Sequence, residues 1–170
     1  MLTREPGGTV TGERLRALLL DPALPALDRR AETLLLLAAR AQHVAEVIAP
    51  ALTAGRHVVC DRFSGSTIAY QGYGRGLDPS ELTRLSAWAS AGVEPDRVVL
   101  LRASVAVATD RLARRSAARD RLEAEGADFF HRVDEGYAAL AAADPVRWRV
   151  VDATGTVEEV AARVAQAARP

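Results

Sequence analysis

The segment 61–76 holds the densest set of side chains that could do chemistry. Arg62 directly follows a short apolar run, and a planar guanidinium at that point can hold a phosphate through parallel hydrogen bonds. Asp61 beside it can fix that guanidinium or hold a water on a metal ion. Groups that can read the edge of a base follow at Ser66, Thr67 and Gln71. The alternative is a surface ion pair followed by a glycine-rich turn.

Three other stretches carry groups of this kind. Residues 4–9, Arg-Glu-Pro-Gly-Gly-Thr, place charges next to a rigid proline and two permissive glycines, as in a turn that approaches a ligand. Arg40 interrupts an apolar helical stretch, where it either needs a partner or ligand or extends to solvent. Five arginines within residues 111–121 could stabilise charge on a transferring phosphate, or they could form a solvated helix face.

Composition limits what the chain can be. Its 170 residues, 49% apolar and 26% charged, predict a single domain over 1–170 with a sizeable core. The net charge is zero and no broad basic cluster is present, so we expect no nucleic acid partner. No apolar run approaches the roughly 18 residues of a membrane span and no secretion signal is apparent, so we expect a cytoplasmic protein without membrane contact.

The basic and thiol side chains narrow the chemistry further. All 22 basic residues are arginine, so the 170 residues cannot support a mechanism that requires a lysine side chain. The single cysteine, Cys60, excludes an internal disulfide and is predicted to be a buried strand thiol without a redox role. The three histidines, at 43, 57 and 131, lack metal-ligand spacing, so we interpret them as structural or surface residues and assign no metal ligand.

Helical and strand patterns alternate along the chain. Strands are predicted at 57–60, 98–101 and 149–151, and the opening residues 1–3 read as the remnant of another. Helices are predicted at 14–20, 28–49, 78–92, 104–116, 127–142 and after the Thr156 cap. This alternation favours an α/β fold, with a parallel sheet flanked by helices on both faces. Ligands of such sheets bind at the carboxyl ends of the strands, where Arg4, Asp61-Arg62 and Asp152–Thr154 lie.

Helical periodicity also predicts which faces are buried. In the helix 28–49 it groups Leu34, Ala38, Ala41, Ala45 and Ile48, with Pro50 beyond the helix end. In the helix 127–142 it groups Phe130, Val133, Tyr137 and Leu140.

Together these stretches resemble the thymidylate kinase family of P-loop nucleoside-monophosphate kinases. The match follows nearly the whole chain in order. It comprises residues 3–9, Ala38-Ala39-Arg40, Asp61-Arg62, Ala69-Tyr70-Gln71-Gly72, Pro95-Asp96, residues 120–123, Asp128-Phe129-Phe130 and Asp152-Ala153. The combination of Arg-Glu-Pro-Gly-Gly-Thr with Asp-Arg and Ala-Tyr-Gln-Gly is far more specific than a lone glycine loop.

The resemblance implies an activity and a set of roles. The reaction would be phosphoryl transfer from ATP, with Mg²⁺, to dTMP, in a protein that binds small nucleotides and forms a homodimer. Arg62 would grip the dTMP phosphate and act in catalysis, while Arg40 and Gln71 would read thymine. The same substrate pocket would include Glu5, Pro6, Leu36, Thr67 and Tyr70. Leu36 stands where many relatives have a phenylalanine that stacks on thymine.

The resemblance also implies how ATP is held. A lid segment at about 111–126 would supply the catalytic arginine, either Arg115 or Arg119. Arg115 would also contact ATP, together with Asp152, Ala153 and Thr154.

One part of the family's pattern has no counterpart here. In the family, a first strand and a Gly-x-x-x-x-Gly-Lys-Ser/Thr phosphate loop precede the Arg-Glu-Pro-Gly-Gly loop. We therefore expect these residues to be an N-terminally incomplete form, short by roughly 30 to 35 residues and inactive alone. Because that first strand lies at the centre of the family's sheet, we also expect an interrupted sheet with unpaired strand edges in 1–170.

Two other functions stay open at this point. The first is a non-catalytic relative that binds dTMP through Arg40, Arg62 and Gln71 without turning over ATP. The second is a nucleoside-monophosphate kinase for another base, because base choice follows from pocket shape. A scaffolding role is the weakest alternative, since it leaves unexplained why polar clusters fall at successive strand ends.

Overall fold

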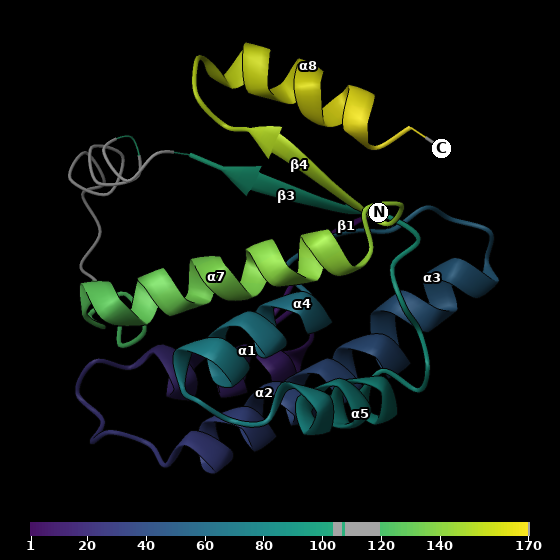
Figure 1. Cartoon of the computed structure of the whole chain (residues 1–170). Helices are drawn as coiled ribbons and strands as arrows, with labels where there is room; N and C mark the ends of the chain where they lie inside the picture. Colours follow the sequence, from purple (N-terminus) through teal and green to yellow (C-terminus); the bar gives the residue numbers. More distant parts are fainter. Residues whose placement is uncertain (104–106, 108–119, 170) are drawn as a thin grey trace. The chain divides into compact units, whose positions relative to one another are not determined.

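The computed structural model describes residues 1–103, 107 and 120–169 (Figure 1). The chain falls into two compact units. Unit 1 comprises Met1–Glu94 and Arg119–Gly136, and unit 2 comprises Pro95–Ala118 and Tyr137–Pro170. The single domain over 1–170 stays a prediction. The predicted helix at 104–116 lies outside the described residues, apart from residue 107.

The described strands pair in parallel, two by two. They are β1 (Leu2–Arg4) with β2 (Val59–Asp61), and β3 (Val98–Arg102) with β4 (Trp148–Asp152). At the carboxyl ends of the strands, Arg4 lies opposite Asp61 in unit 1, and Arg102 lies opposite Asp152 in unit 2. The parallel strands confirm the α/β class, and the described strands form two separate two-stranded sheets. A strand at the opening residues is confirmed as β1.

Helices make up most of the remaining described chain. They are α1 (Val10–Leu20), α2 (Arg29–His43), η1 (Val44–Ile48), α3 (Ala49–Thr53), α4 (Ser64–Thr67), η2 (Ile68–Gly74), α5 (Pro79–Ala89), α7 (Ala127–Ala143) and α8 (Val157–Ala167). The segments η1 and η2 are π-helical, a wider turn that is frequent at functional sites. In unit 2, α8 lies beside the β3–β4 pair (Figure 1).

Side-chain caps fix where several helices begin. Asp78 accepts a hydrogen bond from the Ser80 backbone, as predicted for α5. Thr156 and Glu159 form the reciprocal capping box predicted for α8. The predicted start of the first helix at Arg14 is wrong, because Thr9 caps α1 and the helix begins at Val10.

The predicted helix end before Pro50 is wrong. The helix continues from α2 through the π-helical turn η1 into α3, where Pro50 occupies one of the first two positions. Proline has no N–H to donate to the turn before it, so inside a continuous helix it needs a local departure from α-helical hydrogen bonding. A change of helical pitch at residues 44–48 therefore lets the chain pass the proline.

One helical stretch, Arg29–Thr53, is long and apolar enough to cross a membrane by length and composition alone. The expectation that no segment approaches a span is therefore wrong by that measure. Within the stretch, however, Glu32, Arg40 and His43 are buried and hydrogen-bonded to other parts of unit 1. Core helices pass the same test, and this internal pairing is typical of a core helix.

The predicted buried face of the helix 28–49 is only partly confirmed. Ile48, on η1, is buried and Ala41 is half-buried, but Leu34 is 61% exposed, and Ala38 and Ala45 are exposed with it. The buried residues of α2 are Glu32, Thr33, Leu37, Ala39, Arg40 and His43. Polar side chains can occupy a buried face only where partners satisfy them, and sequence periodicity does not reveal those partners.

The core of unit 1 is built from helices. Its larger buried apolar side chains are Leu19, Leu37, Ile48, Ile68, Leu82, Phe129 and Val133. Of the predicted inward residues on α7, Val133 is buried, whereas Phe130 is 38% exposed and its neighbour Phe129 is buried instead. β2 is not the buried strand that we expected, since Val59 is 63% exposed. A strand with only one described neighbour leaves part of its surface uncovered.

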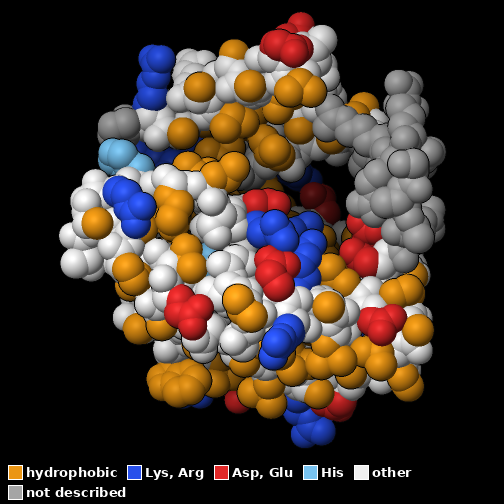
Figure 2. Space-filling view, turned by 180° about the vertical axis from the view of Figure 1, so that it is seen from behind, with side chains coloured by type: hydrophobic (Ala, Val, Ile, Leu, Met, Phe, Trp, Pro, Cys, Tyr) orange, Lys and Arg blue, Asp and Glu red, His pale blue; other side chains and the backbone are white. Residues whose placement is uncertain are grey.

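Hydrophobic side chains reach the surface at many points on the face shown in Figure 2, among scattered charged groups. The large exposed apolar side chains include Leu2, Val10, Leu34, Val59, Trp88, Val146 and Val157. Scattered exposure of this kind is ordinary in folded proteins, so it does not by itself mark a site.

Candidate functional site

Arg40 lies at the centre of a buried polar network in unit 1. Its Nε donates to Glu5 Oε2 at 2.8 Å, its Nη2 to Thr67 Oγ1 at 2.9 Å and its Nη1 to Ser86 Oγ at 3.3 Å. The guanidinium also lies 5.1 Å from the ring centroid of Phe63. Arg40 is 3% exposed, so it does not extend to solvent. The charge is compensated by the Glu5 carboxylate, which is itself buried.

Glu5 reaches this network because the β1–β2 pair positions its backbone. The N–H of Glu5 donates to Asp61 O at 2.9 Å, which continues the β1–β2 pairing by one residue. The Glu5–Pro6 peptide bond is cis, and the Pro6 carbonyl accepts a hydrogen bond from Arg16. The loop that was predicted to approach a ligand therefore turns its glutamate inward, onto Arg40.

His43 completes the network and is fully buried. Its Nδ1 donates to Glu5 Oε1 at 3.2 Å, because a carboxylate can only accept, and its Nε2 lies 2.6 Å from Thr3 Oγ1. Our interpretation of His43 as structural agrees with these contacts, although its link to Glu5 was not foreseen. The available signal was its spacing three residues after Arg40, which places both on one helix face.

Gly8 passes so close to His43 that a side chain would not fit. Gly8 has φ +80°, and an added Cβ would lie 2.6 Å from the His43 ring. Gly55 is a matched control, with φ +70° and open space around its Cβ position. We expect Gly8→Ala to lower the free energy of unfolding by about 2 kcal/mol or more, and Gly55→Ala by about 1 kcal/mol. Urea unfolding measures both, and equal losses would contradict the packing at Gly8.

Arg62 follows β2 in a backbone conformation that is rare for residues other than glycine. Its φ is +66°, and such outliers persist only where the surroundings impose them, often at functional sites. The exposed Arg62 side chain donates from Nη2 to the Tyr70 hydroxyl at 3.3 Å and lies 5.0 Å from the centroid of that ring. The structure thus brings Arg62 and Tyr70 together, as the sequence predicted.

Cys60 lies beside this turn. Its Sγ donates to Arg62 O at 3.1 Å, and burial, together with the nearby charges of Glu5 and Asp61, raises the pKa of the thiol to about 12. The thiol therefore stays protonated at neutral pH. Cys60 lies on β2 as predicted, but it is half-buried rather than buried.

Thr67, Tyr70 and Gln71 lie on one helical stretch formed by α4 and η2, for which no helix was predicted and the alternative interpretation was a glycine-rich turn. Thr67 and Gln71 are buried, and Thr67 accepts from Arg40. Leu36, on α2, is half-buried. The glycines in this stretch lower helix propensity, which hid the helix from the sequence patterns.

Glu32 is a buried carboxylate that sequence reasoning missed. Its Oε1 accepts from Gln71 Nε2 at 2.9 Å and Arg75 Nε at 3.2 Å, and its Oε2 accepts from Arg75 Nη2 at 3.1 Å and Arg121 Nη2 at 2.6 Å. Burial alone would raise the pKa of Glu32, but the hydrogen bonds from Arg75, Gln71 and Arg121 outweigh it and hold the pKa below its ordinary value. Glu32 is therefore ionised at neutral pH.

This depressed pKa predicts an acid-labile contribution to stability. Glu32 stabilises the fold fully above the ordinary glutamate pKa of 4.5, and this contribution is lost as the pH falls through the lower folded pKa. We expect the free energy of unfolding to fall less steeply below pH 4.5 in Glu32→Gln than in the unmutated chain. Urea titrations across the acid range measure this, and identical slopes would contradict the assignment.

In unit 2, the residues predicted to contact ATP form a tight turn after β4. The Asp152 carboxylate accepts from the backbone N–H of Thr154 at 2.8 Å and from its hydroxyl at 2.7 Å. The hydrogen bond from the Thr154 backbone has the larger effect, and together the two bonds hold the pKa of Asp152 below its ordinary value. Ala153 is buried, and its N–H donates to Arg102 O. The predicted lid arginines Arg115 and Arg119 lie outside the described residues.

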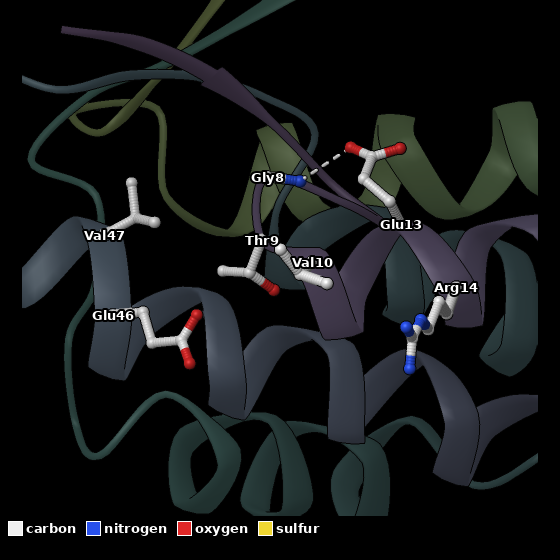
Figure 3. Close-up of a pocket in the computed structure, with 7 residues that line it drawn as sticks. All are labelled: Gly8, Thr9, Val10, Glu13, Arg14, Glu46 and Val47. Atoms are coloured by element: carbon white, nitrogen blue, oxygen red, sulfur yellow. Dashed lines mark hydrogen bonds between the residues drawn. The ribbon is translucent and has the colours of Figure 1, made fainter.

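A hollow of about 760 Å³ lies elsewhere in unit 1 (Figure 3). Its lining residues are Gly8, Thr9, Val10, Glu13, Arg14, Glu46 and Val47. The Glu13 carboxylate accepts from the Gly8 backbone N–H at 3.0 Å and from Arg4, and the Gly8 bond is the main reason that its pKa is lowered. None of the predicted substrate-binding residues lines this hollow.

Comparisons with known proteins agree on one family. A family model described as thymidylate kinase matches residues 1–164. Thymidylate kinase from Solidesulfovibrio magneticus is 53% identical over 168 residues, which cover 95% of this chain and 80% of the relative. The enzyme of the same name from Pelotomaculum thermopropionicum is 53% identical, with 89% of this chain and 70% of the relative covered. The crystal structure of thymidylate kinase from Ehrlichia chaffeensis superimposes with a TM-score of 0.78 at 31% identity, covering 99% of this chain and 81% of that one.

Proposed function

The chain belongs to the thymidylate kinase family, and from this premise we propose that the protein transfers the terminal phosphoryl group of ATP to dTMP, giving dTDP. The observation that supports this most is the buried network in which Glu5 and Thr67 hold Arg40. A guanidinium held by neighbouring side chains is preorganised to meet a polar ligand edge. The names of the relatives do not favour a kinase for another base or a non-catalytic binder.

We assign the dTMP roles to residues of unit 1. Arg62 would hold the phosphate with its exposed guanidinium, which Tyr70 supports through a hydrogen bond and its ring face. Arg40 and Gln71 would read the thymine. The remaining wall of the pocket would be formed by Glu5, Pro6, Leu36, Thr67 and Tyr70.

Catalysis would consist mainly of positioning and charge neutralisation. Arg62 would orient the acceptor phosphate, while Arg115 or Arg119 would stabilise the charge that spreads over the transferring group. The turn Asp152–Thr154, with Arg115, would contact ATP. No covalent intermediate with the enzyme is needed.

The family implies Mg²⁺ as well as ATP. Among the described residues, no group of three or more His, Cys, Asp or Glu side chains could hold a metal ion. Mg²⁺ that arrives with a nucleotide usually needs only one or two carboxylates, because phosphates and water supply its other ligands. The exposed carboxylate of Asp61, next to Arg62, fits that requirement. The ion, when bound, would offset phosphate charge.

We also propose that the protein is a homodimer. The exposed side chains of Leu34 and Ala38 on α2 and of Ala45 on η1 support this, because an apolar helix face can be covered by a second copy. Sedimentation equilibrium tests it, with a dimer mass expected, and Leu34→Glu should shift the protein toward the monomer.

Two measurements test the proposed reaction. Titration calorimetry of the 170 residues with dTMP is expected to give saturable binding. A coupled assay for ADP is expected to show release of ADP that depends on dTMP and is slower with dUMP or dCMP. Binding without ADP release would instead support a non-catalytic binder, and faster turnover of dUMP or dCMP would support another base.

A further inference from the structure

The amide of Gln71 is held in one orientation by Glu32. Gln71 Nε2 donates to Glu32 Oε1 at 2.9 Å, and both side chains are only 1% exposed. A carboxylate accepts hydrogen bonds and cannot donate them, so the atom of the amide that faces Glu32 must be the nitrogen. The amide oxygen of Gln71 is consequently turned away from Glu32.

The other end of the amide makes no hydrogen bond to the protein. Among the residues that the structure describes, Gln71 Oε1 has no hydrogen-bond partner, and no fully enclosed side-chain oxygen or nitrogen lacks one. The oxygen is therefore not fully enclosed by protein atoms, although Gln71 as a whole is only 1% exposed. A buried glutamine that presents only its oxygen offers an acceptor and no donor.

Glu32 is itself fixed from several directions. Arg75, at the end of η2, donates to both of its carboxylate oxygens, and Arg121 donates to Oε2. Arg121 is anchored in turn by its Nε, which donates to the Leu19 carbonyl at 2.9 Å. Arg75 is paired with Glu125 at 2.5 Å and lies 4.9 Å from the Phe129 ring centroid. Rotation of Glu32 would break all of these contacts, so the carboxylate is a rigid partner for Gln71.

Resting on the proposed function, we propose that Glu32 is a positioning residue that sets base specificity by locking the acceptor of Gln71 toward the base. Thymine and uracil carry an N–H donor at N3, which complements that acceptor. Cytosine carries an acceptor at N3, which would face the oxygen of Gln71 without a hydrogen between them. Without its hydrogen bond to Glu32, Gln71 could rotate its amide so that the nitrogen donates to N3 of cytosine.

The effect on discrimination follows from hydrogen-bond energetics. When two acceptors face each other in a buried site, neither has a hydrogen-bond partner. A site built to receive a donor therefore strongly disfavours a ligand that presents an acceptor there. In the unmutated chain we therefore expect dTMP and dUMP to bind more tightly than dCMP. In Glu32→Gln, residue 32 can either donate or accept, so the amide of Gln71 is no longer confined to one orientation.

Calorimetric titrations with dTMP, dUMP and dCMP test this proposal. We expect Glu32→Gln to reduce the ratio of dUMP to dCMP affinity by about tenfold, with the ratio of dTMP to dUMP nearly unchanged. The dTMP-to-dUMP ratio reports only the 5-methyl group. An unchanged dUMP-to-dCMP ratio in a folded Glu32→Gln variant would overturn the role of Glu32.

Arg75→Met is the matched structural control. It removes a guanidinium that pairs with Glu32 but leaves the contact between Glu32 and Gln71 in place. We expect this variant to lose stability and to keep the selectivity of the unmutated chain. A loss of selectivity equal to that of Glu32→Gln would show that loosening the cluster suffices, which would overturn the specific role of the carboxylate.

A second measurement uses the unmutated chain, so it does not depend on whether a variant folds. In the unmutated chain, the side-chain amide protons of Gln71 should exchange slowly with solvent, by NMR, both with and without dTMP. Fast exchange in either state would overturn the lock. A chain that binds dTMP while failing these tests keeps the proposed function, whereas a chain that binds no dTMP loses both.

Discussion

Arg62→Ala is expected to weaken dTMP binding by about 100-fold or more. Two charge-assisted hydrogen bonds from one guanidinium to a phosphate contribute about 3 kcal/mol or more, which corresponds to that factor. Alanine carries the same Cβ as arginine, so the substitution should add no strain at the φ of +66° that residue 62 adopts. Calorimetric titration with dTMP measures the loss.

Two variants sharpen this test of Arg62. Arg84→Ala removes an equal charge from an exposed position on α5 and should change the dTMP affinity less than about threefold. Arg62→Lys keeps the charge without the planar pair of donors and should give an intermediate affinity. If Arg62→Ala binds dTMP as tightly as Arg84→Ala does, the phosphate is held elsewhere.

Arg40→Leu is expected to lower the free energy of unfolding by about 3–5 kcal/mol, because it leaves the buried Glu5 carboxylate without its main partner. His43 still donates to Glu5 but cannot replace the guanidinium bonds to Thr67 and Ser86. Urea unfolding monitored by circular dichroism gives the value.

The control for this prediction is an exposed ion pair on the same helix. Arg30→Leu removes the pair with Asp28, whose two side chains are largely exposed, and should cost less than about 1 kcal/mol. Equal losses in the two variants would mean that burial of the Arg40–Glu5 pair does not set its strength.

Local signals in the sequence identified most elements of the fold. The aspartate that caps α5 and the Thr156–Glu159 box of α8 were readable because a cap depends on neighbours within four residues. The strand ends at Asp61 and Asp152 were readable for a similar reason, since apolar runs stop abruptly there. These local signals do not reveal helical pitch, so the π-helical segments η1 and η2 were not predicted.

Site residues that belong to a family motif could be predicted from the sequence. Site residues whose position depends on a partner far away in the sequence could not. Arg40 and Thr67 were expected to share a pocket, and they are hydrogen-bonded to each other. Glu32 was missed because its partners lie about forty and ninety positions further along the chain, at Arg75 and Arg121. Helical periodicity assigned the apolar side of α2 to the interior, whereas paired polar groups occupy it.

The protonated thiol of Cys60 gives this fold a built-in reporter. Alkylating reagents attack the thiolate, so a half-buried thiol whose pKa is raised to about 12 and that donates to the Arg62 carbonyl should react slowly at neutral pH. We expect dTMP bound at Arg62, as proposed, to slow the reaction further. Mass spectrometry of the alkylated protein measures that protection.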